Sequence, residues 1–362
     1  MRRLSAALIL LACASPGMPP GGPPDVAAPK ILAIIPDSGT VGVSPKEVIF
    51  QFDEVVSERP PAATTLADLF LISPRDGSPA VSWHREAITV RPRRGWRANT
   101  PYTVIMLPGI ADIRGNVRNT GASTFFSTGR TIPRTRITGR VFDWVAGTPA
   151  AGGLVESFVP PDSIHAYIAL VDSSGTFAIE HVPHARYKVR AYLDRNRNNG
   201  IDPGEPWDSV SVTLADSATA TLLVFAHDSL PPRIRDVTET DSATLRMTFD
   251  KPVDPSQTLT AANFAVIGPD SLPIPIASAG APLKDTVAAV KPLMPRPSPT
   301  SEAVIKLGRP LAPKTVYRIR AIGIRGLLGN TGDSERAHTT PAPPPPSAPK
   351  AVVPPPATPI KR

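Results

Sequence analysis

Proline is the feature that most restricts what this chain can fold into. The sequence has 46 prolines and 25 glycines among 362 residues. Proline lacks a backbone N–H and has a fixed φ, so this density disfavours long helices and favours edge strands, turns and linkers. A chain of this length has room for roughly two to four domains, each with its own core. These properties predict an all-β protein built from several small domains.

The N-terminus has the pattern of a secretory signal. Met1-Arg2-Arg3 is basic, and residues 4–12 are apolar but too few to cross a hydrocarbon core of ~30 Å as a helix. The stretch ends in Leu10-Leu11-Ala12-Cys13, which resembles the lipobox of bacterial lipoproteins. That resemblance implies a signal peptide over 1–12 and an acylated Cys13 that anchors the protein in a membrane. The alternative is ordinary cleavage at Ala12-Cys13-Ala14, which would release a soluble protein.

Cys13 is the only cysteine in the sequence, which excludes an intrachain disulfide and a cysteine-ligated zinc site. Residues 13–29 are rich in proline and glycine and are predicted to form a tether. Residues 341–362 include ten prolines and are predicted to form an extended tail. This tail is either a partner-binding arm or a plain disordered terminus.

Two segments repeat the same landmarks in the same order. Residues 48–53 and 245–250 are each a strand of alternating apolar residues that ends at an aspartate, and the alternation places Val48, Phe50 and Phe52 on one face. A mid-domain phenylalanine, a strand containing tyrosine and a Gly-Asn turn then follow in both segments. The repeat predicts two copies of one domain, over 30–130 and 230–340.

The first copy resembles the bacterial Ig-like domain of S-layer and surface proteins. The resemblance rests on Pro-x-x-Gly at 36–39, F-x-F-D-E-x at 50–55, D-x-x-G-N at 112–116 and F-S-T-G at 126–129. The second copy lacks the opening and closing motifs and is a divergent member.

The segment between the repeats has strand patterns of its own. Residues 137–143 begin a strand, residues 172–175 form an Asp-x-x-Gly turn, and Tyr187, Val189 and Ala191 share one strand face. Residues 135–226 resemble the transthyretin-like, carboxypeptidase-regulatory-like β-sandwich, although Ala185 stands where that family usually has glycine. The whole arrangement resembles bacterial envelope lipoproteins with an Ig-like domain followed by such a sandwich. It implies an all-β chain of tandem sandwiches in the order Ig-like, transthyretin-like and Ig-like.

One loop has the spacing of a calcium site. Asp194, Asn196 and Asn198 fall at positions 1, 3 and 5 of a calcium loop, Glu205 falls at position 12, and Asp202 lies between them. A strand rather than a helix precedes the loop, and Arg195 and Arg197 oppose cation binding. The alternative is therefore an Asx-rich loop whose side chains bond their own backbone. Calcium is the one cofactor that the sequence suggests.

The chain is basic, with a formal net charge of +8, and its densest cluster consists of Arg91, Arg93, Arg94 and Arg97 around Trp96. This cluster is a candidate ligand-binding site for a cell-wall or surface glycan or another polyanion. The alternative is a solvated arginine-rich face, and no nucleic-acid partner is expected.

No nucleophile-elbow, P-loop or dinucleotide-binding motif is present. We therefore expect no catalytic residues and a non-enzymatic function: a lipid-anchored envelope protein that serves as a structural or adhesion module. Carbohydrate or polyanion binding is the second class, and a hydrolase is the third and least favoured. The expected location is the cell envelope, as an outer-membrane lipoprotein, with periplasmic and surface-facing orientations both open.

Overall fold

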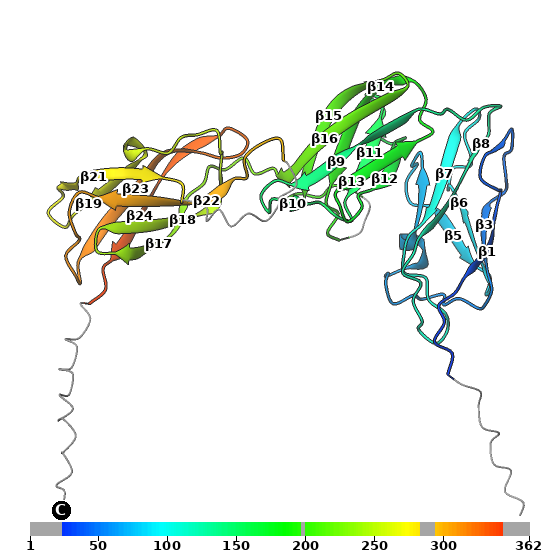
Figure 1. Cartoon of the computed structure of the whole chain (residues 1–362), viewed down its shortest axis with the longest axis horizontal. Helices are drawn as coiled ribbons and strands as arrows, with labels where there is room; N and C mark the ends of the chain where they lie inside the picture. Colours follow the sequence, from blue (N-terminus) through cyan, green and yellow to red (C-terminus); the bar gives the residue numbers. More distant parts are fainter. Residues whose placement is uncertain (1–23, 197–199, 283–293, 343–362) are drawn as a thin grey trace, which may run out of the picture. The chain divides into compact units, whose positions relative to one another are not determined.

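The computed structural model describes residues 24–196, 200–282 and 294–342. These residues form the strands β1 to β24 and two short 3₁₀ helices, with no α-helix among them (Figure 1). The predicted all-β fold of tandem sandwiches is confirmed. The chain divides into two compact units, Met1–Ile132 (unit 1) and Pro133–Arg362 (unit 2). In the described part of the chain, no helix has the length and apolar content needed to span a bilayer.

Some predicted features lie outside the described residues. They are the signal peptide (1–12), Cys13, most of the tether, Asn198 in the candidate calcium loop, and the tail from residue 343 onward. They stay predictions.

Unit 1 is a sandwich of two four-stranded sheets. The first sheet has the order β1-β3-β6-β5 and is antiparallel throughout, whereas in the second, β2-β8-β7-β4, only the short β2 runs parallel to its neighbour. The elements are β1 (Ile31–Ile35), β2 (Thr40–Val41), β3 (Val48–Phe52), η1 (Leu66–Leu69), β4 (Phe70–Ser73), β5 (Ala80–Trp83), β6 (Ala87–Arg91), β7 (Pro101–Met106) and β8 (Ala122–Ser127).

The core of unit 1 follows from the alternation in β3. Val48, Phe50 and Phe52 are at most 1% exposed, as predicted for one strand face. Phe50 meets Phe70 of β4 edge-to-face, with ring centroids 5.3 Å apart. The facing sheets therefore close on a shared aromatic core.

The first half of unit 2 is a second sandwich. Its long strand β16 pairs parallel with β9 and, at its other end, antiparallel with β15, so one strand belongs to both sheets. Tyr187, Val189 and Ala191 of β14 point into its core, as predicted. The strands are β9 (Arg136–Asp143), β10 (Thr148–Pro149), β11 (Leu154–Phe158), β12 (Tyr167–Leu170), β13 (Thr176–Glu180), β14 (Ala185–Tyr192), β15 (Pro206–Leu214) and β16 (Ser217–Ala226).

Gly139 allows the parallel pairing of β9 with β16. A Cβ at this position would lie 1.8 Å from the carbonyl oxygen of Ala220 and 2.8 Å from the ring of Phe177. Only glycine permits this approach of the two backbones.

The second half of unit 2 is a sandwich with sheets β17-β18-β22-β21 and β20-β19-β23-β24. Leu245, Met247 and Phe249 of β18 are at most 2% exposed, while Arg246 between them is exposed. The elements are β17 (Ile234–Asp241), β18 (Thr244–Val253), η2 (Ala261–Asn263), β19 (Phe264–Ile267), β20 (Pro273–Ile274), β21 (Ile276–Gly280), β22 (Thr300–Leu307), β23 (Val316–Arg325) and β24 (Thr331–Thr339).

This sandwich and unit 1 share the strand order of one sheet, β17-β18-β22-β21 against β1-β3-β6-β5. Their second sheets differ, because β20 pairs with β19 whereas β2 pairs with β8. The two sandwiches also share a local hydrogen bond. The Tyr102 hydroxyl accepts the N–H of Arg97 at 2.8 Å, and the Tyr317 hydroxyl accepts the N–H of Ala312 at 2.9 Å, five residues upstream in both cases. The η1 and η2 turns each precede the mid-domain phenylalanine strand. The division into two copies of one domain stays a prediction.

Candidate functional site

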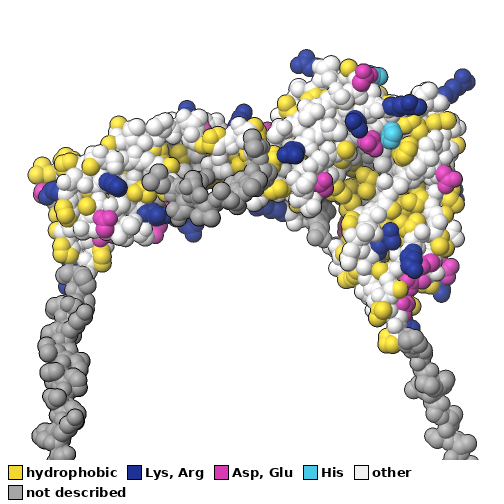
Figure 2. Space-filling model, in the orientation of Figure 1, with side chains coloured by type: hydrophobic (Ala, Val, Ile, Leu, Met, Phe, Trp, Pro, Cys, Tyr) yellow, Lys and Arg dark blue, Asp and Glu magenta, His cyan; other side chains and the backbone are white. Residues whose placement is uncertain are grey.

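The arginine cluster predicted to bind ligands begins with Arg91, the last residue of β6, and continues on the loop that follows. Arg91, Arg93, Arg94 and Arg97 are all exposed. Two of these side chains are engaged within unit 1. The Nη1 atom of Arg94 lies 3.1 Å from the Asp76 carboxylate, and Nε of Arg93 donates to the Ser78 carbonyl. Figure 2 shows lysine and arginine side chains scattered over the visible face rather than gathered into one continuous surface.

Trp96 has a different environment from the arginines around it. Its ring meets Tyr102 and Phe126 edge-on, with centroid distances of 4.8 and 5.0 Å, and packs against the core of unit 1. Its Nε1–H is buried and has no hydrogen-bond partner among the described residues. The indole therefore helps to close the end of the sandwich, and the four arginines are the solvent-facing part of this cluster.

The candidate calcium loop is closed by Glu205, which is only 6% exposed. Its carboxylate accepts the N–H of Arg195 at 2.8 Å and the N–H of Asp202 at 3.0 Å. The amide of Asn196 donates to the Asp202 carboxylate. Four of the five predicted ligand residues are thus described, and oxygens of two of them already accept hydrogen bonds from within the loop. A calcium ion would have to replace those donors.

A second group of carboxylates was not predicted. Asp25, Glu54 and Asp112 offer oxygen atoms within 4.8 Å of one another, and no other group of three His, Cys, Asp or Glu side chains in the described ranges does so. Figure 2 shows acidic side chains at this end of unit 1, where the described chain begins. Burial, and then the charges of Asp25 and Asp112, raise the pKa of Glu54. Hard oxygen ligands of this kind can hold a divalent cation.

Asp112 is the rigid member of this trio. It is 2% exposed, and its carboxylate accepts the backbone N–H groups of Arg114 and Asn116 and the side-chain amide of Asn116, at 2.7–2.8 Å. The carboxylate of Asp112 therefore already accepts hydrogen bonds within its own D-x-x-G-N turn, and a cation would bind to a group that holds this turn together. Sequence reasoning missed the trio because its members are far apart along the chain.

The corresponding position in the C-terminal sandwich carries a cation of the chain itself. Phe52-Asp53-Glu54 corresponds to Phe249-Asp250-Lys251, so a lysine stands where unit 1 has Glu54. Nζ of Lys251 lies 2.8 Å from the Asp228 carboxylate. Unit 1 and the C-terminal sandwich therefore differ in the local charge at this position.

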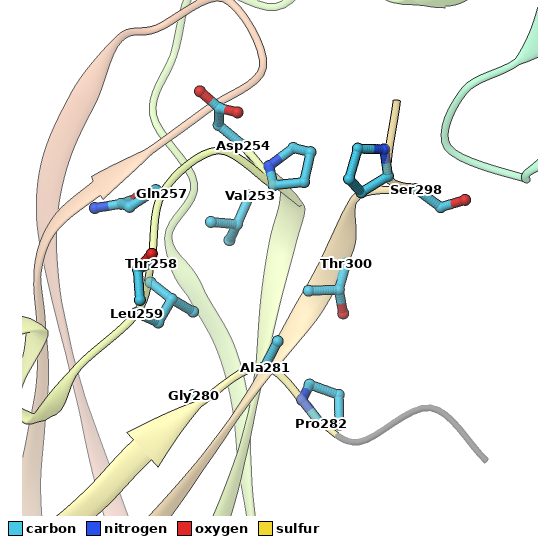
Figure 3. Close-up of a pocket in the computed structure, with 12 residues that line it drawn as sticks. Val253, Asp254, Gln257, Thr258, Leu259, Gly280, Ala281, Pro282, Ser298 and Thr300 are labelled. Atoms are coloured by element: carbon cyan, nitrogen blue, oxygen red, sulfur yellow. The ribbon is translucent and has the colours of Figure 1, made fainter. Parts of the chain in front are cut away.

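The C-terminal sandwich has a mostly apolar hollow of about 570 Å³ (Figure 3). Val253 and Leu259 line it, and the side-chain amide of Gln257, also in the lining, donates to the Gly323 carbonyl and accepts the N–H of Arg325. Further described lining residues are in the segments 280–282 and 297–300. Among the described lining residues, Asp254 is the only titratable one, and its carboxylate pairs with Arg325 at 3.0 Å.

A comparison of the sequence with known families identifies the first sandwich. Residues 25–128 match the family described as "Bacterial Ig-like domain".

The chain contains a bacterial Ig-like domain.

This match confirms the resemblance proposed for the first copy, whose motifs lie inside the matched residues. No enzyme family was found. A search of curated proteins gave no match.

Several solved structures are similar to parts of the chain. The N-terminal part of the bacterial S-layer protein SbsC is 21% identical over 32% of this chain and 25% of its own, with a TM-score of 0.24. A structure of SbsC domains 1–6 is 10% identical over 88% of this chain and 55% of its own, with a TM-score of 0.22. A putative carbohydrate-binding protein from Bacteroides uniformis is 13% identical over 57% of this chain and 99% of its own, with a TM-score of 0.18. The chain therefore spans between a quarter and about half of the SbsC structures that it matches.

Proposed function

We propose that this protein is a non-catalytic, lipid-anchored module of a bacterial cell envelope with a structural or adhesive role. The observation that carries the proposal is the order of features along the chain. A lipobox-like sequence ends at Cys13, a short Pro/Gly-rich segment follows, and the bacterial Ig-like domain begins at residue 25. In this arrangement, acyl chains on Cys13 hold the protein at a membrane while the sandwiches extend from it.

The middle sandwich is proposed to be a transthyretin-like spacer. Its mixed pairing, in which β16 joins two sheets, gives a compact body with buried aromatic and aliphatic residues. Its connecting loops, including residues 193–205, are the proposed places for ligand binding. The outer membrane is the proposed location.

The alternative is a carbohydrate- or polyanion-binding envelope protein that uses the exposed arginines at the end of β6 and on the loop that follows. Arg91 and Arg97 support this alternative, because no described residue forms an ion pair with either of them. Retention on heparin that falls steeply with salt, and is reduced by Arg97→Gln, is the expected behaviour of such a protein.

The anchoring proposal is tested by protease shaving of intact cells and by fractionation. The wild type is compared with Cys13→Ala and with Ser15→Ala, a control substitution just beyond the cleavage site. We expect the wild type and the control to remain with the membrane and Cys13→Ala to lose the acyl label and be released. Shaved protein would favour surface adhesion, and protected protein would favour a periplasmic role. Equal release of all three forms would refute the anchored module.

A further inference from the structure

Unit 1 carries a second cleft that is unrelated to the arginine cluster at the end of β6. It has a volume of about 320 Å³ and lies between the loop after β3, the turn that leads into η1, and the strand β5. The side chains used in the argument below are Glu58, Arg59, Thr64, Leu66 and Trp83, all of which line it. The volume is at the lower end of the roughly 300–1,000 Å³ range of ligand pockets, so the cleft suits one ring system rather than a peptide.

Trp83 gives the cleft a fixed apolar wall. It lies on β5, an edge strand whose only described strand partner is β6, and it is partly buried against the core. Its Nε1–H donates to the carbonyl of Val56 at 2.9 Å. This bond and the core packing set the orientation of the indole before any ligand arrives, which lowers the entropic cost of binding. Leu66 adds an aliphatic surface to the same cleft.

The loop after β3 adds two charged side chains to the lining of the cleft. Glu58 and Arg59 are exposed, and in the described ranges no ion pair or side-chain hydrogen bond involves either side chain. Their backbone is nevertheless held. The N–H of Arg59 donates to the Ser57 hydroxyl at 3.2 Å, and Pro60, which follows Arg59, is buried. A proline restricts the preceding residue to extended conformations, so the loop presents Arg59 at a defined place.

These walls together define a ligand chemistry. A fixed indole covers the apolar C–H face of a sugar ring, and a guanidinium pairs with a carboxylate through two parallel hydrogen bonds. Hydroxyl and carboxylate oxygens such as those of Thr64 and Glu58 accept hydrogen bonds from ring hydroxyls. An isolated anion would use only Arg59 and would leave the indole and Leu66 without a function.

We propose that the cleft between η1 and β5 binds a carboxylated sugar unit of an acidic glycan, with Trp83 under the ring and Arg59 on the carboxylate. The adhesive role proposed above would give this glycan binding its purpose in the cell, and the inference rests on that role in this respect alone. The recognition itself is a property of unit 1 and does not depend on the lipid anchor.

The test uses the full mature chain with Cys13→Ala, and the probes are glucuronate, glucose and acetate. Ligand-observed NMR and calorimetry measure the affinities. We expect glucuronate to bind at least ten times more tightly than either glucose or acetate. Arg59→Gln is expected to reduce glucuronate binding to the level of glucose. Arg114→Gln is the control: it removes the same charge from an exposed turn of the same unit, and we expect it to leave the affinity for glucuronate unchanged.

Trp83→Phe is the second variant, since Trp83→Ala removes core packing and can unfold unit 1. We expect Trp83→Phe to weaken both sugars severalfold while acetate binding is unchanged, with an intact thermal transition as the folding control. The proposal is overturned if glucuronate and acetate bind equally, if Arg59→Gln and Arg114→Gln behave alike, or if no probe binds to folded protein. None of these results depends on where Cys13 places the protein, so they are independent of the anchoring experiment.

Discussion

Phe50→Ala is expected to destabilise one part of this protein selectively. Phe50 is 0% exposed and packs edge-to-face on Phe70 at 5.3 Å. Removing a buried phenylalanine costs about 3–5 kcal/mol, because transfer free energy is lost and a cavity is left. A domain of this size has a stability of roughly 5–15 kcal/mol. The substitution therefore removes a large fraction of the stability of unit 1.

The core contacts explain why the effect should be confined. Among the described residues, the hydrophobic cluster around Phe50 contains only residues of unit 1, and the cluster around Met247 contains only residues of the C-terminal sandwich. Met247 aligns with Phe50 in the repeated strand and is also 0% exposed. Met247→Ala is thus the matched control, with an expected cost of about 2–5 kcal/mol in the other sandwich.

The assay is guanidinium unfolding, followed by limited proteolysis at intermediate denaturant to assign each transition to its domain. We expect Phe50→Ala to move the unit 1 transition to lower denaturant and leave the others in place. Met247→Ala should move the transition of the C-terminal sandwich to lower denaturant and leave that of unit 1 in place. If each variant shifted all the transitions together, the sandwiches would not have separate cores and this reasoning would be refuted.

Two further predictions concern turns. Asp172 accepts hydrogen bonds from the hydroxyl of Ser174 and the N–H of Thr176, which hold its pKa below the usual value. The ionised carboxylate therefore stabilises the fold above the unfolded-state pKa, and this contribution is lost as the pH falls through the folded-state pKa. Asp172→Asn should destabilise unit 2 at neutral pH but not in acid, as measured by melting curves from pH 7 down to 2. Glu205→Gln should lower the melting temperature of unit 2 with or without calcium, because the carboxylate accepts two backbone N–H bonds. If calcium raised the melting temperature of the wild type but not of the variant, the loop would instead be a calcium site.

The candidate sites show where local sequence stops being informative. The basic character of residues 91–97 was evident from the sequence, but the role of Trp96 depends on Tyr102 and Phe126, which only the closed sandwich brings to its ring. In the same way, Asp25, Glu54 and Asp112 meet through the pairing of distant segments. The cleft beside Trp83 also joins three separate segments, so its uncommitted charges are recognised only when their neighbours are known.

The sequence by itself determined the class of fold. Proline density excluded long helices, and the period-two alternation in β3, β14 and β18 chose the buried face of each strand, because successive side chains of a strand point to opposite sides. It also predicted the repeat, since each copy must bury the same pattern of side chains. The tertiary structure alone decided which polar groups are left without partners inside the fold. Hydrogen bonding and charge pairing depend on distances of a few ångströms between residues far apart in the chain, and strand order, rather than local sequence, sets those distances.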